Sequence, residues 1–260
     1  MTEARLAARA LVYGYGSAVV GRDVDIEVRS GEVLCLLGPN GSGKTTLFKT
    51  LLGLLPAQAG HVLLDGLPIT ELPRQEIARR VAYVPQAHTA HFPFRVIDMV
   101  VMGRTAHLGL FAAPTQQDRQ RAYDALALLG IAGLAEREYT RISGGQRQLA
   151  LVARSLVQDA PGIVMDEPTA NLDFGNQVIV LSEVKRLAAR GLAVLLSTHD
   201  PEHAFSVASR VALLDRGRLV DQGQPQTVLT SARLKSVYGI DVTVERLASG
   251  QTVCSPLYRS

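Results

Sequence analysis

The stretch that most constrains this chain runs from Gly38 to Thr46 and reads GPNGSGKTT. It matches the phosphate-binding pattern G-x-x-x-x-G-K-[ST]. The apolar residues 32–37 before it predict a buried strand, and residues 47–55 after it predict a helix. Backbone N–H groups and the positive end of a helix dipole then meet at the loop, which favours a bound anion. The sequence therefore predicts a nucleoside triphosphate site rather than a chance glycine-rich turn.

The residue types in this loop suit that chemistry. Glycines let the main chain approach phosphate oxygens because no Cβ intervenes. Lys44 is expected to reach the β- and γ-phosphates, and the Thr45 hydroxyl is expected to ligate Mg²⁺. The predicted nucleotide-binding residues of the loop are Gly38, Pro39, Asn40, Gly41, Ser42, Gly43, Lys44, Thr45 and Thr46.

Two later stretches place polar groups at the ends of predicted elements. Ser143 is predicted to cap a helix, with Gln146 completing a capping box, and the glycines between them leave N–H groups for a second anion. The apolar run 162–165 predicts a strand that ends at Asp166 and Glu167. Adjacent buried carboxylates need cationic partners. A Mg²⁺–nucleotide would supply one, and a salt bridge is the alternative.

Other candidates are weaker. His199 and His203 are four apart, a spacing that suits a metal on a helix, but the sequence shows no third ligand, so zinc is not predicted. Tyr13 and Tyr15 are predicted to share one face of the first strand. Either is able to stack on a flat base, and an ordinary core or rim tyrosine is an equal alternative.

Composition narrows the class of protein. A chain of 260 residues with 47% hydrophobic and 20% charged residues has ample material for a globular core. Its net charge of +3 comes from scattered arginines, which predicts a solvated surface and no nucleic-acid partner. Two distant cysteines, Cys35 and Cys254, fit a reducing compartment. No signal peptide and no membrane span are predicted.

Strands alternate with helices over most of the chain, which predicts an α/β fold with a mainly parallel sheet. The first strands are expected to break at residues 14–17 and again at Gly21. An irregular loop is expected at 88–93, helices at 96–103, 116–130 and 175–190, and a strand at 192–196. The tail from Ser231 is expected to form one helix and a small hairpin around residues 249–250. Its sequence indicates no function.

Six stretches, in order, resemble the ATP-binding subunit of an ABC transporter: GPNGSGKTT, VPQ, ISGGQ, IVMDEP, ANLD and STHD. The resemblance covers nearly the whole chain. It implies a P-loop NTPase core with a mainly parallel sheet, an N-terminal antiparallel β region and a helical subdomain inserted at about 89–158. The ATPase domain would span 1–230, followed by a short C-terminal extension, 231–260. The departures are conservative: Ile142 replaces the usual Leu, and Ala170-Asn171 replaces Ser-Ala.

The resemblance also implies roles for single residues. Asp166 would hold Mg²⁺ through water, Glu167 would orient and deprotonate the attacking water, and Gln86 would sense the metal and the γ-phosphate. His199 would contact the γ-phosphate, and Tyr15, rather than Tyr13, would stack on the base. The metal-site residues would be Thr45, Gln86 and Asp166. The signature residues, which would bind ATP held by a second copy, are Ser143, Gly144, Gly145 and Gln146, and Asp173 would face that copy.

By the same resemblance, two copies would close head to tail around ATP and Mg²⁺, and hydrolysis would reopen them. The subunit would dock through residues 88–103 onto separate transmembrane permease subunits at the cytoplasmic face of the inner membrane. A solute-binding protein would be an indirect partner. MGR at 102–104, ISGGQRQL and LDFGNQ resemble ATPases that import iron–siderophore, haem or cobalamin. Molybdate or tungstate import, and a soluble ABC ATPase outside transport, are the alternatives. A binding module without hydrolysis is disfavoured because Glu167 and His199 are both present.

Overall fold

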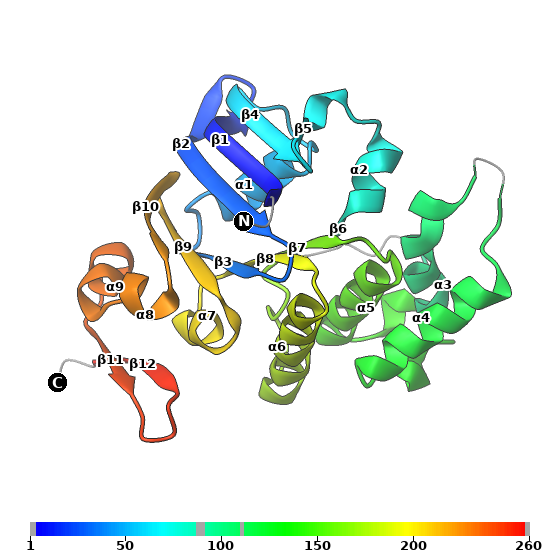
Figure 1. Ribbon diagram of the computed structural model, residues 1–260. Coiled ribbons are helices and arrows are strands. Elements are labelled where there is room, and N and C mark those ends of the chain that lie inside the picture. The colour runs from blue at the N-terminus through cyan, green and yellow to red at the C-terminus, as the bar shows by residue number, and fades with distance from the viewer. Residues whose placement is uncertain (1–3, 87–91, 110–111, 258–260) are drawn as a thin grey trace. The chain divides into compact units, whose positions relative to one another are not determined.

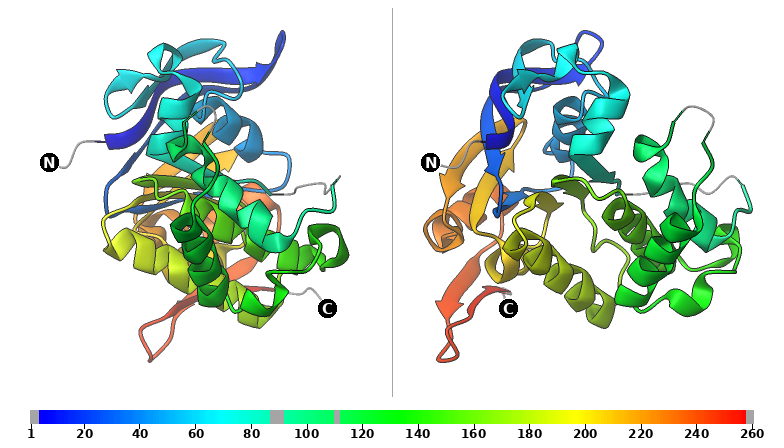
Figure 2. Two further views of the ribbon diagram at one scale, coloured as in Figure 1. Left: turned by 90° about the vertical axis from the view of Figure 1, so that its right-hand side faces the viewer. Right: turned by 45° about the vertical axis from the view of Figure 1, so that its right-hand side comes forward.

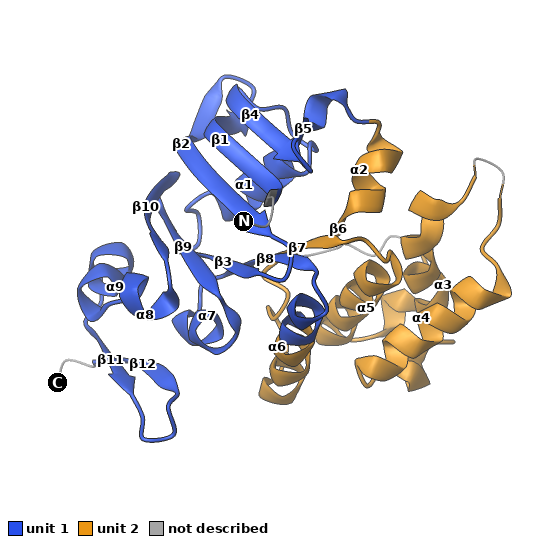
Figure 3. Cartoon of the chain, in the orientation of Figure 1, with its two compact units in different colours: residues 1–72, 184–260 blue, residues 73–183 orange. Residues whose placement is uncertain are grey.

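The computed structural model describes residues 4–86, 92–109 and 112–257. These residues form two compact units, which Figure 3 colours blue and orange. Unit 1 consists of Met1–Leu72 and Val184–Ser260, and unit 2 of Pro73–Glu183. The irregular loop predicted from residue 88, and the first part of the predicted docking segment, fall mainly outside the described residues. The domain boundaries predicted at 89, 158 and 231 stay predictions.

Unit 1 contains two larger sheets and a two-stranded sheet near the C-terminus, labelled in Figure 1. The antiparallel sheet has the order β2-β1-β4-β5. Its strands are β1 (Ala4–Tyr15), β2 (Ala18–Arg29), β4 (Ala59–Leu64) and β5 (Leu67–Pro68). In the second sheet β3 (Val33–Leu37) pairs in parallel with β8 (Ala193–Thr198) and β9 (Arg210–Asp215). The edge strand β10 (Arg218–Gly223) pairs antiparallel with β9. The predicted antiparallel N-terminal region and parallel-dominated sheet are both present.

The strand break predicted at Gly21 is wrong, because β2 runs through that residue. Gly21 pairs with Tyr13 on β1. A Cβ placed on Gly21 would lie 2.3 Å from the Tyr13 ring. Gly21 therefore leaves room for the tyrosine ring, because it has no side chain, and it does not mark a turn. The break predicted at residues 14–17 is correct, since β1 ends at Tyr15 and β2 begins at Ala18.

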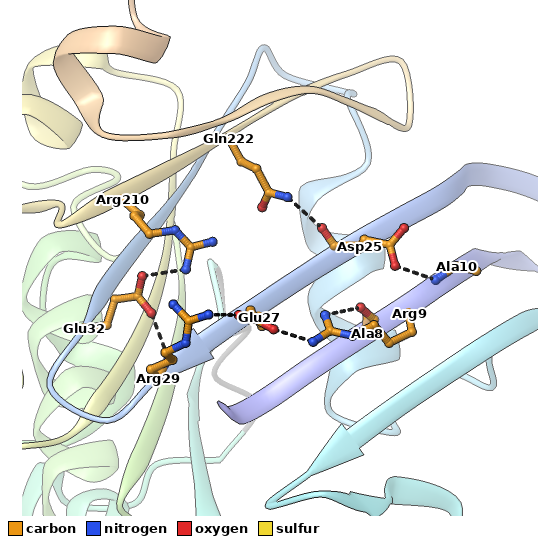
Figure 4. Close-up of polar contacts among 9 residues, drawn as sticks. All are labelled: Ala8, Arg9, Ala10, Asp25, Glu27, Arg29, Glu32, Arg210 and Gln222. Atoms are coloured by element: carbon orange, nitrogen blue, oxygen red, sulfur yellow. Dashed lines mark hydrogen bonds and ion pairs between the residues drawn. The ribbon is translucent and has the colours of Figure 1, made fainter. Parts of the chain in front are cut away.

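Charged side chains tie the two larger sheets of unit 1 together near the start of β3, as Figure 4 shows. Glu32 accepts a hydrogen bond from the guanidinium of Arg210 at 2.8 Å and one from the backbone N–H of Arg29 at 2.9 Å. Arg29 in turn pairs with Glu27, which also pairs with Arg9 on β1. The entry to β3 is thus held from both sheets, and β3 itself is buried over its whole length, as expected of a strand with parallel neighbours on both sides.

The C-terminal part of unit 1 packs against strands β3 and β9. It contains α7 (Pro201–Val207), α8 (Pro225–Val228), α9 (Ser231–Tyr238) and the hairpin β11 (Val242–Arg246) with β12 (Thr252–Pro256). The hairpin is the red element next to the C-terminus in Figure 2. The helix and hairpin predicted for the tail are confirmed. The strand predicted at 192–196 is longer than expected, because Ser197 and Thr198 continue the parallel ladder opposite Leu36 and Leu37.

Unit 2 is mostly helical. Its two strands, β6 (Val81–Val84) and β7 (Gly162–Asp166), pair in parallel. Its helices are α2 (Arg74–Arg80), α3 (Val96–Val101), α4 (Gln116–Leu128) and α5 (Gly144–Val157), and α6 (Phe174–Ala189) begins in it. Helices α3, α4 and α5 pack on one another. The helix predicted at 96–103 ends as an α-helix at Val101 and continues as 3-10 turns over Met102–His107. In the described parts of the chain, no helix combines the length and apolar character needed to cross a bilayer.

The capped start of α4 predicts a specific acid response. Hydrogen bonds from the backbone N–H and the hydroxyl of Thr115, reinforced by Arg104 at 2.9 Å, lower the pKa of Asp118 to about 2. A carboxylate with a lowered folded-state pKa stabilises the fold above its unfolded value of about 3.9, and this stabilisation is lost as the pH falls toward 2.

Asp118→Asn should therefore lower the free energy of unfolding at pH 7 by about 1 kcal/mol, and the difference from wild type should shrink between about pH 4 and pH 2. Urea unfolding at a series of pH values measures it. Asp124→Asn is the control, because Asp124 lies on the same helix but is exposed and bonds only locally, to Gln120. A difference that stays constant down to pH 2 would contradict the assignment.

Candidate nucleotide-binding and hydrolysis site

The loop between β3 and α1 (Lys44–Leu51) has the geometry predicted for a phosphate cradle. Gly43 caps the helix with φ of 102°, a conformation that glycine adopts without strain. Lys44 is only 5% exposed. Its ammonium donates hydrogen bonds to the carbonyl oxygens of Gly38 at 2.7 Å and Pro39 at 3.1 Å. The cation is thus held against its own loop, at the N-terminus of a helix, where anions bind favourably.

The two tyrosines of β1 lie in different environments. Tyr13 is fully buried, and Tyr15 is 48% exposed. The two rings therefore differ in exposure, although they are two positions apart on β1, and Tyr15 is the last residue of that strand. The expectation that they share one face stays a prediction. A Cβ on Gly43 would lie 3.1 Å from the Tyr13 hydroxyl, so this ring supports the phosphate loop from the protein side. Burial raises the pKa of Tyr13. Tyr15, in contrast, presents a ring to solvent.

His199 comes from the strand next to the one that precedes the loop. β3 and β8 are parallel, and Leu37 is opposite Thr198. Gly38 and His199 therefore leave the sheet at the same edge, the carboxyl ends of neighbouring parallel strands, where ligands bind in α/β proteins. His199 is exposed. Its neighbours are anchored: Thr198 Oγ1 accepts from the Asp200 N–H at 3.1 Å, and Asp200 caps α7.

His203 does not join His199 in a metal site. It lies on α7, and its Nε2 is 3.5 Å from Asp200 Oδ2. Within the described residues, no group of three or more His, Cys, Asp or Glu side chains is arranged to hold a metal ion. The predicted magnesium site is of a different kind, because it uses one hydroxyl, one amide and one carboxylate and so contains a single residue of these four types.

In unit 2, as in unit 1, predicted site residues lie at the carboxyl ends of neighbouring parallel strands. β6 and β7 are parallel, with Val84 opposite Met165, so Gln86 and the carboxylates Asp166 and Glu167 leave the strands at one edge. Gln86 Nε2 donates a hydrogen bond to Glu167 Oε2 at 2.9 Å. Asp166 is completely buried and Glu167 is 6% exposed. Three of the predicted site residues are thus brought together within this unit.

Glu167 also has an unusual backbone conformation. Its φ is +47°, in the left-handed region that a non-glycine residue rarely adopts. The turn that follows is closed by a hydrogen bond from the Ala170 N–H to the Glu167 carbonyl at 3.0 Å. Such a conformation costs free energy and concentrates at functional sites, where the surrounding structure enforces it. Here it directs an acidic side chain toward Gln86 instead of letting the strand continue.

The second predicted anion site is a capped helix end. Ser143 Oγ accepts from the Gln146 N–H at 3.2 Å, and Gln146 Oε1 accepts from the Ser143 N–H at 3.0 Å, which completes the predicted capping box. Gly144 and Gly145 form the first turn of α5, and Ser143 and Gly144 are exposed. Asp173 caps α6 in a similar way, accepting from the Asn176 N–H at 2.9 Å. The described structure divides the predicted set between the units: Tyr15, the phosphate loop and His199 lie in unit 1, and Gln86, Asp166, Glu167, the signature residues and Asp173 in unit 2.

The pattern of the ABC transporter family matches residues 22–170, which contain the phosphate loop, the capped helix and both carboxylates. The chain belongs to the ATP-binding subunits of ABC transporters. The resemblance inferred from the six motifs is thereby confirmed. As a member of this family the chain is an ATPase that binds ATP, and its activity is coupled to transport.

Similar proteins extend the comparison over most of this ABC ATPase. It is 42% identical to the hemin import ATP-binding protein HmuV of Pseudomonas entomophila, over 88% of this chain and 91% of that one. It is 35% identical to the ferric enterobactin transport ATP-binding protein FepC of Escherichia coli, over 100% of this chain and 97% of that one. A solved structure described as a metal-chelate type ABC transporter, in an inward-facing conformation, matches with a TM-score of 0.83 and 32% identity over 99% and 98% of the two chains. The predicted fold class is confirmed.

Proposed function

We propose that this ABC ATPase is the ATP-hydrolysing subunit of a bacterial importer for a metal chelate, such as haem or an iron–siderophore. The hydrogen-bonded pair of Gln86 and Glu167, next to the buried Asp166, is the observation that supports hydrolysis rather than binding alone. The chelate class is supported by the names of HmuV and FepC and by the description of the transporter with the similar fold. The subunit would bind ATP at the cytoplasmic face of the inner membrane and dock on permease subunits.

The proposed division of labour follows the chemistry of each group. Lys44 and the loop amides bind the β- and γ-phosphates, and Tyr15 stacks on the base. Glu167 holds the attacking water and takes its proton, and Gln86 orients that carboxylate. His199 contacts the γ-phosphate from the strand next to the loop. A general base of this type accelerates a reaction by about 10²–10⁴-fold, so Glu167 is the residue on which turnover depends most.

The donor set of the proposed metal site fits Mg²⁺. The residues are Thr45, Gln86 and Asp166, which offer hydroxyl, amide and carboxylate oxygens, the hard ligands that this cation prefers. Gln86 uses its amide nitrogen on Glu167, and its amide oxygen is of the right type for a cation. When bound, Mg²⁺ would neutralise negative charge that develops on the phosphates. Thr45 and Asp166 would hold it, and Asp166 would do so through water.

We also propose the two-fold dimer. The capped start of α5 offers exposed backbone N–H groups, and a second copy would present the ATP on its phosphate loop to them. The γ-phosphate would then contact both copies only in the closed dimer, which gives ATP a differential affinity for that state. Asp173 would lie at the seam between the copies. A solute-binding protein would deliver the chelate to the permease.

Purification from membranes tests the transport assignment. The tagged chain, expressed in its native host and extracted with detergent, should bring down a polytopic membrane protein. After reconstitution in liposomes, that complex should transport haemin or a ferric siderophore with ATP inside, and should not transport molybdate. Recovery of the chain only in a soluble complex would overturn the importer assignment, and transport of molybdate would overturn the substrate class.

A further inference from the structure

The C-terminal extension makes a direct contact with the proposed hydrolysis site. The hydroxyl of Tyr238, the last residue of α9, donates a hydrogen bond to the backbone carbonyl of His199 at 3.1 Å. The two residues are 39 positions apart in sequence. The tail has no sequence motif of its own, so nothing in the sequence points to this contact.

The C-terminal extension packs against the core of unit 1 through buried side chains. Leu234 of α9 is 1% exposed and belongs to the same core cluster as Leu37 of β3 and Ala204 of α7. Val237 and Tyr238 pack against this cluster, as do hairpin residues Val244 and Cys254. The Val244 N–H also donates to Ser231 Oγ at 3.2 Å. The helix that carries Tyr238 is therefore built into the same core as β3, the strand that precedes the phosphate loop.

The peptide group that joins His199 to Asp200 is held at both of its polar atoms: its N–H donates to Thr198 Oγ1 at 3.1 Å, and its carbonyl accepts from Tyr238 at 3.1 Å. Thr198 ends the parallel ladder, and Asp200 caps α7 through the Glu202 N–H at 2.8 Å. His199 is the single residue between the strand and this cap, and its side chain is exposed. Together these two hydrogen bonds restrict the backbone rotation at His199, and hence the position from which its side chain projects.

We propose that the C-terminal extension positions His199 for ATP hydrolysis, with Tyr238 as the positioning residue. This inference rests on the proposed function, in which His199 contacts the γ-phosphate. Tyr238 would touch neither ATP nor the attacking water. Its hydroxyl would hold the His199 backbone so that the imidazole meets the γ-phosphate without a search among alternative orientations, an advantage that appears in turnover rather than in ATP binding.

Tyr238→Phe removes the hydroxyl and keeps the ring that packs on the core. The full chain carrying this change should hydrolyse MgATP with kcat reduced by about three- to tenfold, the effect of losing one hydrogen bond, and with KM changed by less than about twofold. Tyr123→Phe is the matched control. Tyr123 lies on α4, and its hydroxyl donates a hydrogen bond to Glu136 at 2.6 Å. The control therefore also removes a bonded hydroxyl, but it should leave kcat unchanged.

A double-mutant cycle with His199→Ala separates positioning from general stability. If Tyr238 acts through His199, adding Tyr238→Phe to His199→Ala should lower kcat no further. If the two losses multiply, or if Tyr238→Phe alone leaves kcat at the wild-type value, the inference is overturned while the proposed function stands. If His199→Ala itself hydrolyses ATP at the wild-type rate, the proposed role of His199 fails, and the inference fails with it.

Discussion

Glu167→Gln is expected to slow ATP hydrolysis by about 10²–10⁴-fold while ATP still binds. In the wild type, the Gln86 amide nitrogen lies 2.9 Å from the Glu167 carboxylate. The glutamine has the same size as Glu167 and keeps an oxygen that accepts this hydrogen bond, but its amide does not take a proton from water at neutral pH. The left-handed backbone at residue 167 should hold the glutamine in the same direction, because the turn to Ala170 does not depend on the side chain.

Steady-state phosphate release at saturating MgATP measures this effect, and titration with a fluorescent ATP analogue checks binding. Because hydrolysis reopens the proposed dimer, the variant should also accumulate as an ATP-bound dimer in size-exclusion chromatography. Glu76→Gln is the control: that carboxylate lies on α2 in the same unit and pairs with Arg80 at 2.8 Å. A Glu167→Gln variant that turns over at the wild-type rate would exclude Glu167 as the base.

Lys44→Ala should weaken ATP binding itself, by about 10- to 100-fold in Kd. The estimate corresponds to the loss of a charge-assisted hydrogen bond worth about 1.5–3 kcal/mol. Lys44 is 5% exposed, and its ammonium lies against the carbonyls of Gly38 and Pro39, so the charge is held on the loop itself. Removing it leaves the phosphates to the loop amides and the helix dipole alone.

Equilibrium titration of the purified chain with ATP gives the Kd, and a thermal unfolding curve verifies that the variant is folded. Lys49→Ala is a matched control, since Lys49 lies in the last turn of the same helix, α1, on the far side from the loop. Equal losses of affinity in the two variants would mean that Lys44 contributes only to the general positive charge of the region. An unchanged Kd for Lys44→Ala would remove it from the binding site.

Much of the fold follows from local sequence patterns. The β3–loop–α1 unit, the Ser143 capping box and the β7 strand ending at Asp166 are each encoded in one short continuous stretch of sequence, because caps, turns and short strands depend on near neighbours. The strand ends at Leu37 and Asp166 could be placed in advance for the same reason. The order of the six motifs then identified the family.

Other features depend on residues that meet only in the folded chain. Tyr13 is buried and Tyr15 is exposed in the folded chain, although alternation alone assigned both to one face of β1. Gly21 lies in a strand because a ring from β1 fills the space beside it, which no local pattern around residue 21 contains. The continuation of α3 as 3-10 turns was likewise not encoded in its apolar pattern.

The amino-acid sequence by itself determined the glycine-rich loop between β3 and α1, the carboxylates at the end of β7 and the capping box at Ser143, because those features arise from neighbouring residues. Tertiary structure alone decided which tyrosine lies under the loop, that Gln86 bonds to Glu167 across 81 residues, and that Tyr238 bonds to His199. Such pairs depend on how strands and helices pack, and packing joins residues whose sequence separation carries no signal.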